Sequence, residues 1–89
     1  MIQTQIEIIN KLGLHARAAA KMATLCARFG CKIQTGIGDR MVDGKSVMSL
    51  MLLAAAKGTQ LTLRTDGDDE QEAMDAITAL INDYFGEGE

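Results

Sequence analysis

The chain has one histidine, His15, and it lies where an apolar strand pattern ends and an alanine-rich helix pattern begins. The turn signal Gly13-Leu14 precedes it, so we expect His15 at or near the N-cap of a helix. The first N–H groups of a helix have no partner inside the helix, and together with the macrodipole they attract an anion. An unprotonated imidazole nitrogen in such a place can attack phosphorus as a nucleophile. These residues therefore predict a site for a transient phosphoryl group.

Two neighbours of His15 suit the product of that attack. The oxygens of a phosphoimidazole would lie near the backbone N–H groups of Ala16 and Arg17, and the Arg17 guanidinium would add charge-assisted hydrogen bonds. No carboxylate lies close to His15 in the sequence to activate water, which favours phosphoryl transfer over hydrolysis. The simpler interpretation is that His15 is only a capping or surface residue. A metal site is not expected, because one histidine and two cysteines offer no recognisable ligand spacing.

Three stretches of the sequence resemble the HPr family, the small histidine phosphocarriers of the phosphoenolpyruvate-dependent phosphotransferase system. They are Gly13-Leu14-His15-Ala16-Arg17, Gly44-Lys45-Ser46-Val47-Met48 and Ala56-Lys57-Gly58. The likeness covers essentially the whole chain, including its length and the spacing of the motifs. It implies that His15 accepts phosphate from Enzyme I at Nδ1 and passes it to a IIA-type protein or domain. It also implies a partner surface at Ala16, Arg17, Ala20, Val47, Met48 and Met51.

One position departs from the family pattern. A proline usually follows the His-Ala-Arg triplet, whereas this chain has Ala18. Proline suits the first turn of a helix because its missing N–H would be unpaired there anyway. Alanine keeps the N–H and is an excellent helix former. We therefore expect the helix to form with a less fixed entry angle, and we expect the departure to affect transfer kinetics rather than the site.

Ser46 has two interpretations. As the N-cap of a second helix it would accept a hydrogen bond from an unpaired N–H and contribute about 1 kcal/mol. In some members of the family that the chain resembles, the matching serine is phosphorylated by a dedicated kinase, an HPr kinase/phosphorylase. A phosphate there would add roughly −1.5 to −2 charges and repel an acidic partner. The N-cap role is expected, and regulation is a second hypothesis.

The composition bounds the function. A chain of 89 residues predicts one small domain over 1–89, and the net charge of −3 with scattered basic residues argues against nucleic-acid binding. The first residues alternate instead of forming the apolar part of a signal peptide, and the longest apolar run, 50–56, is too short to span a membrane. We expect a cytoplasmic monomer that needs no cofactor. For Cys26 and Cys31 we expect reduced, partly buried thiols, with a disulfide as the alternative.

Alternation of apolar and polar residues predicts strands, and apolar residues three and four apart predict helices. Strands are expected over 2–8, 31–35, 40–43 and 60–65, and helices over 16–28, over 47–55 and from Asp68 or Asp69 onward. The order β-α-β-β-α-β-α predicts an α+β open-faced sandwich, with helices on one face of a four-stranded antiparallel sheet. The resemblance implies the strand order 1-4-2-3.

Some finer features follow from the same patterns. Gly30 and Gly58 are expected to take left-handed conformations that close the first two helices, and residues 86–89 are expected to fray. The predicted buried stripes are Ala19, Met22, Ala23, Cys26 and Ala27 in the first helix and Ala73, Ala76, Ile77, Leu80, Ile81 and Tyr84 in the last.

The second predicted helix is almost unbroken in its apolar character, so it cannot bury every side. Leu50 and Leu53 are expected in the core, whereas some of Val47, Met48 and Met51 should stay exposed. An apolar patch of this kind usually marks a site for a partner.

Three classes of function compete. The leading hypothesis is a phosphocarrier, either of sugar uptake or of the nitrogen-related branch whose carrier is called NPr, and the two branches share the His15 motif. A regulatory binding module that docks without carrying phosphate is the second class, and the presence of His15 argues against it. A phosphohistidine enzyme acting on small molecules is the third, and the lack of a second catalytic residue argues against it. We therefore expect a stoichiometric carrier with a shallow, exposed site, and not an enzyme.

Overall fold

The computed structural model describes residues 1–88, which contain four strands, three α-helices and one short 3₁₀ helix. The strands are β1 (Ile2–Glu7), β2 (Lys32–Ile37), β3 (Arg40–Asp43) and β4 (Gln60–Asp66). The helices are α1 (Ala16–Cys26), α2 (Val47–Leu52), α3 (Glu70–Asn82) and the 3₁₀ helix η1 (Tyr84–Gly86). The strands form one antiparallel sheet in the order β1-β4-β2-β3. The predicted fold class and strand order are confirmed.

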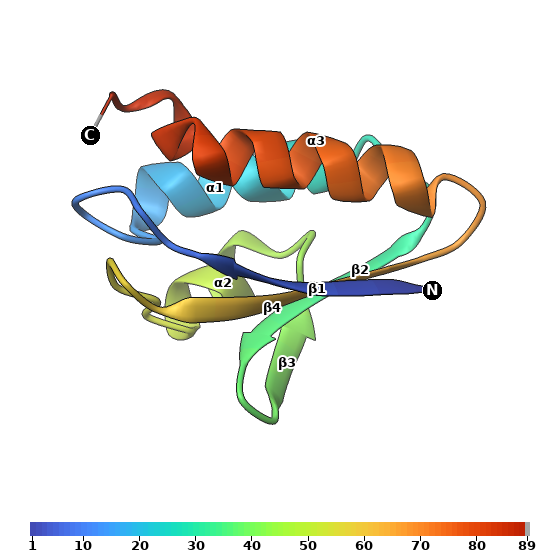
Figure 1. Cartoon of the computed structure of the whole chain (residues 1–89), viewed down its shortest axis with the longest axis horizontal. Coiled ribbons are helices and arrows are strands. Elements are labelled where there is room, and N and C mark those ends of the chain that lie inside the picture. The colour runs from blue at the N-terminus through green and yellow to red at the C-terminus, as the bar shows by residue number, and fades with distance from the viewer. Residues whose placement is uncertain (89) are drawn as a thin grey trace.

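Helices α1 and α3 lie side by side over one face of the sheet (Figure 1). Helix α2 contacts α1 and β3. The core lies between the sheet and the helices, and its largest fully buried apolar side chains are Ile8, Met22, Ile33, Leu50, Leu61, Leu63, Ile77, Ile81 and Phe85. Burial of this apolar surface is the main force that holds the two long helices against the sheet.

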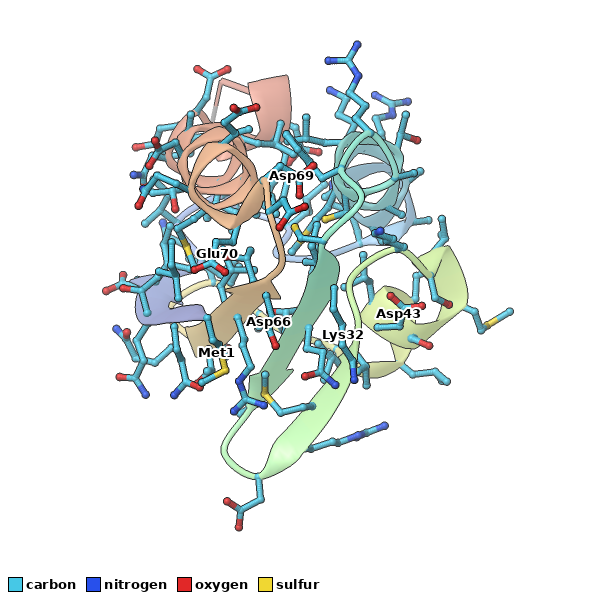
Figure 2. All side chains as sticks on the ribbon, turned by 90° about the vertical axis from the view of Figure 1, so that its right-hand side faces the viewer. Met1, Lys32, Asp43, Asp66, Asp69 and Glu70 are labelled. Atoms are coloured by element: carbon cyan, nitrogen blue, oxygen red, sulfur yellow. The ribbon has the colours of Figure 1, made fainter. Side chains whose placement is uncertain are left out.

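The start of α3 is tied to three neighbouring segments. The hydroxyl of Thr65, at the end of β4, donates to the Glu70 carbonyl at 3.0 Å, and the Glu70 carboxylate accepts the N–H of Gly67 at 3.1 Å. The amino group of Met1 lies 3.1 Å from the same carboxylate. Met1 and Glu70 are labelled next to each other in the side-chain view (Figure 2). The Asp69 carboxylate accepts the N–H groups of Gly30 and Cys31, both at 2.9 Å.

Asp69 is the N-cap residue of α3, as one of the two predicted alternatives had it, but its side chain makes no capping hydrogen bond. Its oxygens are used by the segment between α1 and β2 instead. The same contacts explain why the prediction of a left-handed Gly30 is wrong. Helix α1 ends at Cys26, two residues earlier than predicted, and Asp69 holds the chain after it without a positive φ at Gly30.

Helix α2 is also shorter than the predicted 47–55. The N–H groups of Leu53 and Ala54 bond to carbonyls three residues earlier, which tightens the last turn. Ala54 then takes the left-handed conformation with φ 51°, so the prediction that Gly58 ends this helix is wrong. Gly58 has a positive φ of 91° in the loop that leads to β4.

The predicted buried stripes need two corrections. Ala27 is exposed because α1 has already ended, and Tyr84 is exposed because the chain leaves the α3 axis before it. Phe85 is fully buried in place of Tyr84, and Ala18 and Met74 are buried as well. The other predicted stripe positions are buried or half-buried.

Cys26 and Cys31 are buried and free, as expected, and burial raises the pKa of the Cys26 thiol to about 12. None of the helices within residues 1–88 combines the length and the apolar character that a membrane span requires.

Candidate functional site

His15 is the N-cap of α1, as predicted. Its backbone is extended, with φ −76° and ψ 180°, and its carbonyl accepts the N–H of Ala19 at 2.8 Å. Nδ1 accepts the N–H of Arg17 at 3.3 Å, so the imidazole does what a serine or aspartate does at this position in other helices. Nδ1 is thereby directed at the N-terminal N–H groups of α1, and Ala18 does not prevent the helix from beginning at Ala16.

The loop before His15 is fixed against the segment that follows α2. Leu14 is buried, and its N–H donates to the carbonyl of Ala55 at 2.8 Å. Gly13 has a φ of 66°, and a Cβ at this position would lie 2.4 Å from the Ala55 oxygen. Only glycine fits this close approach. His15 therefore stands on a loop that has little freedom to move.

A carboxylate is hydrogen-bonded to the His15 ring, and the sequence does not predict this contact. Glu87 Oε2 is hydrogen-bonded to His15 Nε2, although the two residues are 72 positions apart in the chain. Its other oxygen, Oε1, accepts from Nδ2 of Asn10 at 2.8 Å. The prediction that residues 86–89 fray is wrong for Glu87, and Glu89 lies outside the described residues. The one available sequence signal was Phe85, a large apolar residue just before the tail.

The backbone before Glu87 is held firmly. Phe85 is fully buried, and its carbonyl accepts a hydrogen bond from Nζ of Lys21 at 2.8 Å. Tyr84 and Phe85 have positive φ values of 56° and 53°. Residues other than glycine rarely adopt this left-handed backbone region. This sharp bend turns Phe85 into the core and brings Glu87 back over the start of α1.

The surroundings of Glu87 keep it ionised. Partial burial raises the pKa of its carboxyl, but the hydrogen bonds from Asn10 and His15, followed by the charge of Lys21, hold that pKa below its ordinary value. The side chain of Glu87 is 15% exposed and that of His15 is 27% exposed. Glu87 is therefore a pure acceptor at neutral pH, and the His15 ring stays accessible from one side.

The other predicted site residues surround His15 on the surface. Ala16, Arg17 and Ala20 are exposed, and the Arg17 guanidinium makes no hydrogen bond or ion pair within residues 1–88. A depression of about 280 Å³ lies beside His15, between the loop at Leu12 and the residues around Met51. His15 thus lies at the edge of a shallow depression and not at the base of a deep pocket.

Helix α2 supplies the predicted apolar surface. The Ser46 hydroxyl accepts the N–H of Ser49 at 3.2 Å, which confirms the N-cap. Leu50 and Leu53 are buried, as expected. The exposed apolar side chains form what we call the apolar patch: Leu12, Val47, Met48, Met51 and Leu52. Leu12 and Leu52 are not predicted from the sequence, because neither the loop nor the helix end has a clear periodicity.

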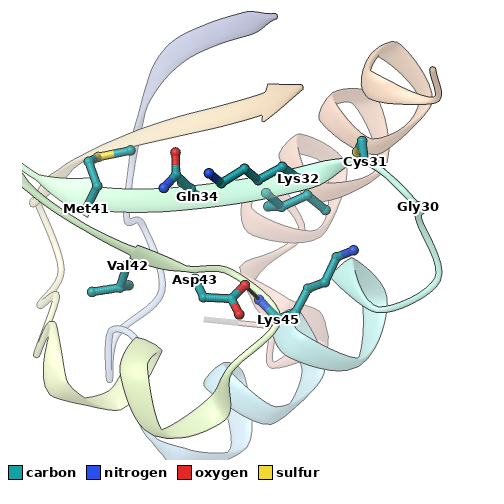
Figure 3. A pocket seen from close by; sticks show the side chains of 9 residues that line it. Gly30, Cys31, Lys32, Gln34, Met41, Val42, Asp43 and Lys45 are labelled. Carbon is teal, nitrogen blue, oxygen red and sulfur yellow. Dashed lines mark hydrogen bonds between the residues drawn. The ribbon is translucent and has the colours of Figure 1, made fainter. Parts of the chain in front are cut away.

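A second pocket, of about 440 Å³, lies between β2, β3 and the segment that leads from α1 into β2 (Figure 3). The Lys45 ammonium crosses to the carbonyl of Phe29 at 2.7 Å, and Asp43 accepts the N–H of Lys45 at 2.9 Å. His15 does not border this pocket. Nowhere in residues 1–88 do three or more histidine, cysteine, aspartate or glutamate side chains form a group that could hold a metal ion.

Residues 2–83 match the protein-family model described as the PTS HPr component phosphorylation site. The chain belongs to the HPr family. It is 57% identical to phosphocarrier protein HPr of Neisseria meningitidis over 89 residues, which is the full length of both chains. It is 41% identical to phosphocarrier protein NPr of Shewanella violacea over 86 residues, 97% of this chain and 94% of that protein. The crystal structure of HPr-C-His from Thermoanaerobacter tengcongensis matches with a TM-score of 0.94 and 40% identity over 98% of both chains.

Membership of the HPr family assigns the general role. The chain is a phosphocarrier of the phosphotransferase system and not a catalytic enzyme. The exposed, shallow surroundings of His15 suit such a carrier, because two proteins must reach the same atom in turn.

Proposed function

We propose that the chain accepts a phosphoryl group from phospho-Enzyme I on Nδ1 of His15 and passes it to a IIA-type protein of a sugar-uptake phosphotransferase system. The observation that carries this proposal is the direction of Nδ1, which accepts the Arg17 N–H at 3.3 Å and faces the N-terminus of α1. This atom has both a lone pair and a ready-made environment for an anion.

The transfer needs no co-reactant beyond the two proteins. The lone pair of Nδ1 forms the N–P bond, the bond between phosphorus and the donor group of Enzyme I breaks, and the donor keeps the electron pair. The N–H groups of Ala16 and Arg17 and the guanidinium of Arg17 then stabilise the phosphoryl oxygens. Transfer to the IIA-type protein repeats the displacement with Nδ1 as the leaving group.

The apolar patch is the docking surface that we propose for both partners. It adjoins His15 through Leu12 and Met51, which border the same depression. Its members Val47, Met48 and Leu52 lie along α2, and Ala16, Arg17 and Ala20 extend it along α1. Loss of exposed apolar surface on docking would provide affinity, while Arg17 would meet acidic groups of the partner.

The nitrogen-related branch is the alternative pathway, because a relative named NPr is 41% identical over nearly the whole chain. The residues around His15 do not separate the two branches. Competition between sugar-specific and nitrogen-related IIA proteins for the phosphorylated chain would separate them. The cytoplasmic location, the single domain and the monomeric state stay predictions.

Regulation at Ser46 is a further part of the proposal. The Ser46 hydroxyl caps α2 directly beside Val47 and Met48, so a phosphate there would place negative charge at the edge of the apolar patch. An HPr kinase/phosphorylase would be the enzyme responsible. Incubation of wild type and Ser46→Ala with such a kinase and ATP, followed by intact mass, tests this part.

The central experiment combines the chain with Enzyme I, Mg²⁺ and phosphoenolpyruvate and measures intact mass. One acid-labile phosphate on wild type and none on His15→Ala is the expected result. No phosphate on wild type, with an Enzyme I that phosphorylates another carrier in the same mixture, would contradict the proposal. The apolar patch would then point to a binding module that carries no phosphate.

A further inference from the structure

We infer that Glu87 is a positioning residue for His15. Its carboxylate accepts a hydrogen bond from Nε2–H, so that the neutral ring holds its lone pair on Nδ1, directed at the N-terminus of α1. The same carboxylate stabilises the positive charge that the ring gains in phosphoryl transfer. The inference deepens the proposed function of His15 and rests on it.

Only one neutral tautomer of the His15 imidazole is compatible with both hydrogen bonds of the ring. An ionised carboxylate has no proton to give, so Nε2 must donate to Oε2 of Glu87. A backbone N–H has no lone pair to offer, so Nδ1 must accept from Arg17. Only the Nε2–H form of the imidazole satisfies both partners. The nucleophilic lone pair is therefore assigned to Nδ1 by groups on opposite sides of the ring.

Glu87 is itself held in place by a buried amide. Asn10 is fully buried, and its Nδ2 donates to Glu87 Oε1 at 2.8 Å and to the Gly13 carbonyl at 2.7 Å. A flipped amide would put Oδ1 against two acceptors, so this orientation is dictated by its neighbours. The consequence is that Oδ1 remains buried without a partner in the described chain. An unpaired buried oxygen is unfavourable, and it is tolerated here because both acceptors of Nδ2, the Gly13 carbonyl and the Glu87 carboxylate, require this orientation.

The path of the backbone supports the same conclusion. Tyr84 and Phe85 both adopt the left-handed region, which persists in residues with side chains only when the surrounding structure enforces it. Burial of Phe85 and the bond from Lys21 provide that enforcement. Strained backbone gathers at functional sites, and here it delivers one carboxylate to the ring.

The contact fits the chemistry of both transfers. When Nδ1 forms its bond to phosphorus, the ring becomes cationic and part of its charge resides at Nε2–H. The Glu87 carboxylate lies on this side of the ring, away from the incoming phosphoryl group. No proton leaves Nε2, so the ring returns to the same neutral form when the N–P bond breaks. The pairing of an imidazole with an orienting carboxylate follows the logic of nucleophilic triads, with the ring itself as the nucleophile.

The test compares Glu87→Gln and Glu87→Ala with Asp83→Asn. Asp83 is an exposed carboxylate of the same segment whose side chain makes no hydrogen bond within residues 1–88, so its variant controls for the lost charge. The ¹⁵N shifts of the His15 ring, recorded at a pH where the ring is neutral, report the populations of the two neutral forms. Rates of phosphorylation by limiting Enzyme I report the function.

Wild type and Asp83→Asn should show the Nε2–H form alone. Glu87→Ala should show a mixture and be phosphorylated roughly tenfold more slowly, the lower end of losses for orienting partners of metal-bound histidines. Glu87→Gln, whose amide oxygen can still accept from Nε2–H but carries no charge, should keep more of this form and still be slowed. A wild-type ring form in Glu87→Ala would overturn the inference, and so would a changed ring form with an unchanged rate. If wild type itself took no phosphate, the proposed function would fail, and the ¹⁵N spectra would still decide whether Glu87 fixes the ring.

Discussion

The two ends of α1 are each met by a carboxylate from the last quarter of the chain, but the two carboxylates bind different kinds of donor. At the C-terminal end, Asp69 accepts two backbone N–H groups, those of Gly30 and Cys31. At the N-terminal end, Glu87 accepts from two side chains, those of Asn10 and His15. Helix α3 runs antiparallel to α1, so its start delivers Asp69 to one end and its exit delivers Glu87 to the other.

The difference separates stability from reactivity. Asp69 accepts backbone N–H groups, so its contacts hold the chain in place. They do not bring a reactive side chain into position. The nearby thiols are inert as well, because burial raises the pKa of Cys26 and Cys31 and keeps both protonated at neutral pH. Glu87 binds the one ring in the chain that can act as a nucleophile at neutral pH. The same kind of bridge therefore fixes a loop at one end and a reactive group at the other.

The largest expected effect comes from the anchor of the tail. Phe85→Ala should lower the free energy of unfolding by about 3–5 kcal/mol, because it empties a fully buried aromatic site. It should also release Glu87, so the His15 ring should become a mixture of neutral forms. Urea unfolding and ¹⁵N spectra measure the two effects. Phe85→Leu keeps most of the apolar volume and should show both effects in the same direction but smaller, and an unchanged urea midpoint in Phe85→Ala would contradict the burial.

Asn10 links stability and reactivity in one side chain. Asn10→Ala should cost about 1–3 kcal/mol, because the carbonyl of Gly13 loses a buried donor. Glu87 loses its second hydrogen bond as well, so phosphorylation by Enzyme I should slow in the same direction as in Glu87→Gln. Denaturation and single-turnover phosphorylation of the same sample check both expectations. A variant that is destabilised and yet transfers phosphate at the wild-type rate would show that Asn10 serves only the loop.

A crossed pair of variants tests the comparison most directly. Asp69→Asn should lower the melting temperature by roughly 4–8 °C, because the amide cannot accept from both N–H groups with the strength of a carboxylate. It should leave the rate of phosphorylation unchanged, since no group near His15 is altered. Glu87→Gln should slow phosphorylation and lower the melting temperature less than Asp69→Asn does, because it weakens contacts between side chains and leaves the backbone hydrogen bonds intact. Equal changes in both quantities for both variants would remove the distinction between the two ends.

The sequence was a good guide where structure follows from neighbouring residues. Alternation gave the four strands, and the residue types at His15 and Ser46 gave two N-caps that the structure confirms. It failed where a contact joins distant positions. His15 and Glu87 are 72 positions apart, and no periodicity in the sequence predicts their contact. Gly30 was expected to take a left-handed conformation because of its residue type, yet a carboxylate 39 positions away holds that segment instead.

Acid should weaken the C-terminal end of α1 through Asp69. The hydrogen bond from the Gly30 N–H, followed by that from Cys31, holds the pKa of the Asp69 carboxyl below its ordinary value of 3.8. A carboxyl whose pKa is lower in the folded than in the unfolded chain stabilises the fold fully above the unfolded value. The contribution is lost as the pH falls through the folded value. The difference in stability between wild type and Asp69→Asn should therefore be constant near neutral pH and shrink below about pH 4.

The Cys31 thiol, which also contacts Asp69, does not complicate this measurement, because burial raises its pKa and it stays protonated throughout the acid range. Urea unfolding of the two proteins across that range provides the curve. A difference that grew on acidification would mean that folding disfavours the ionised form of the Asp69 carboxyl. That result would contradict the role of the two backbone N–H groups, and the C-terminal end of α1 would then need another explanation for its order.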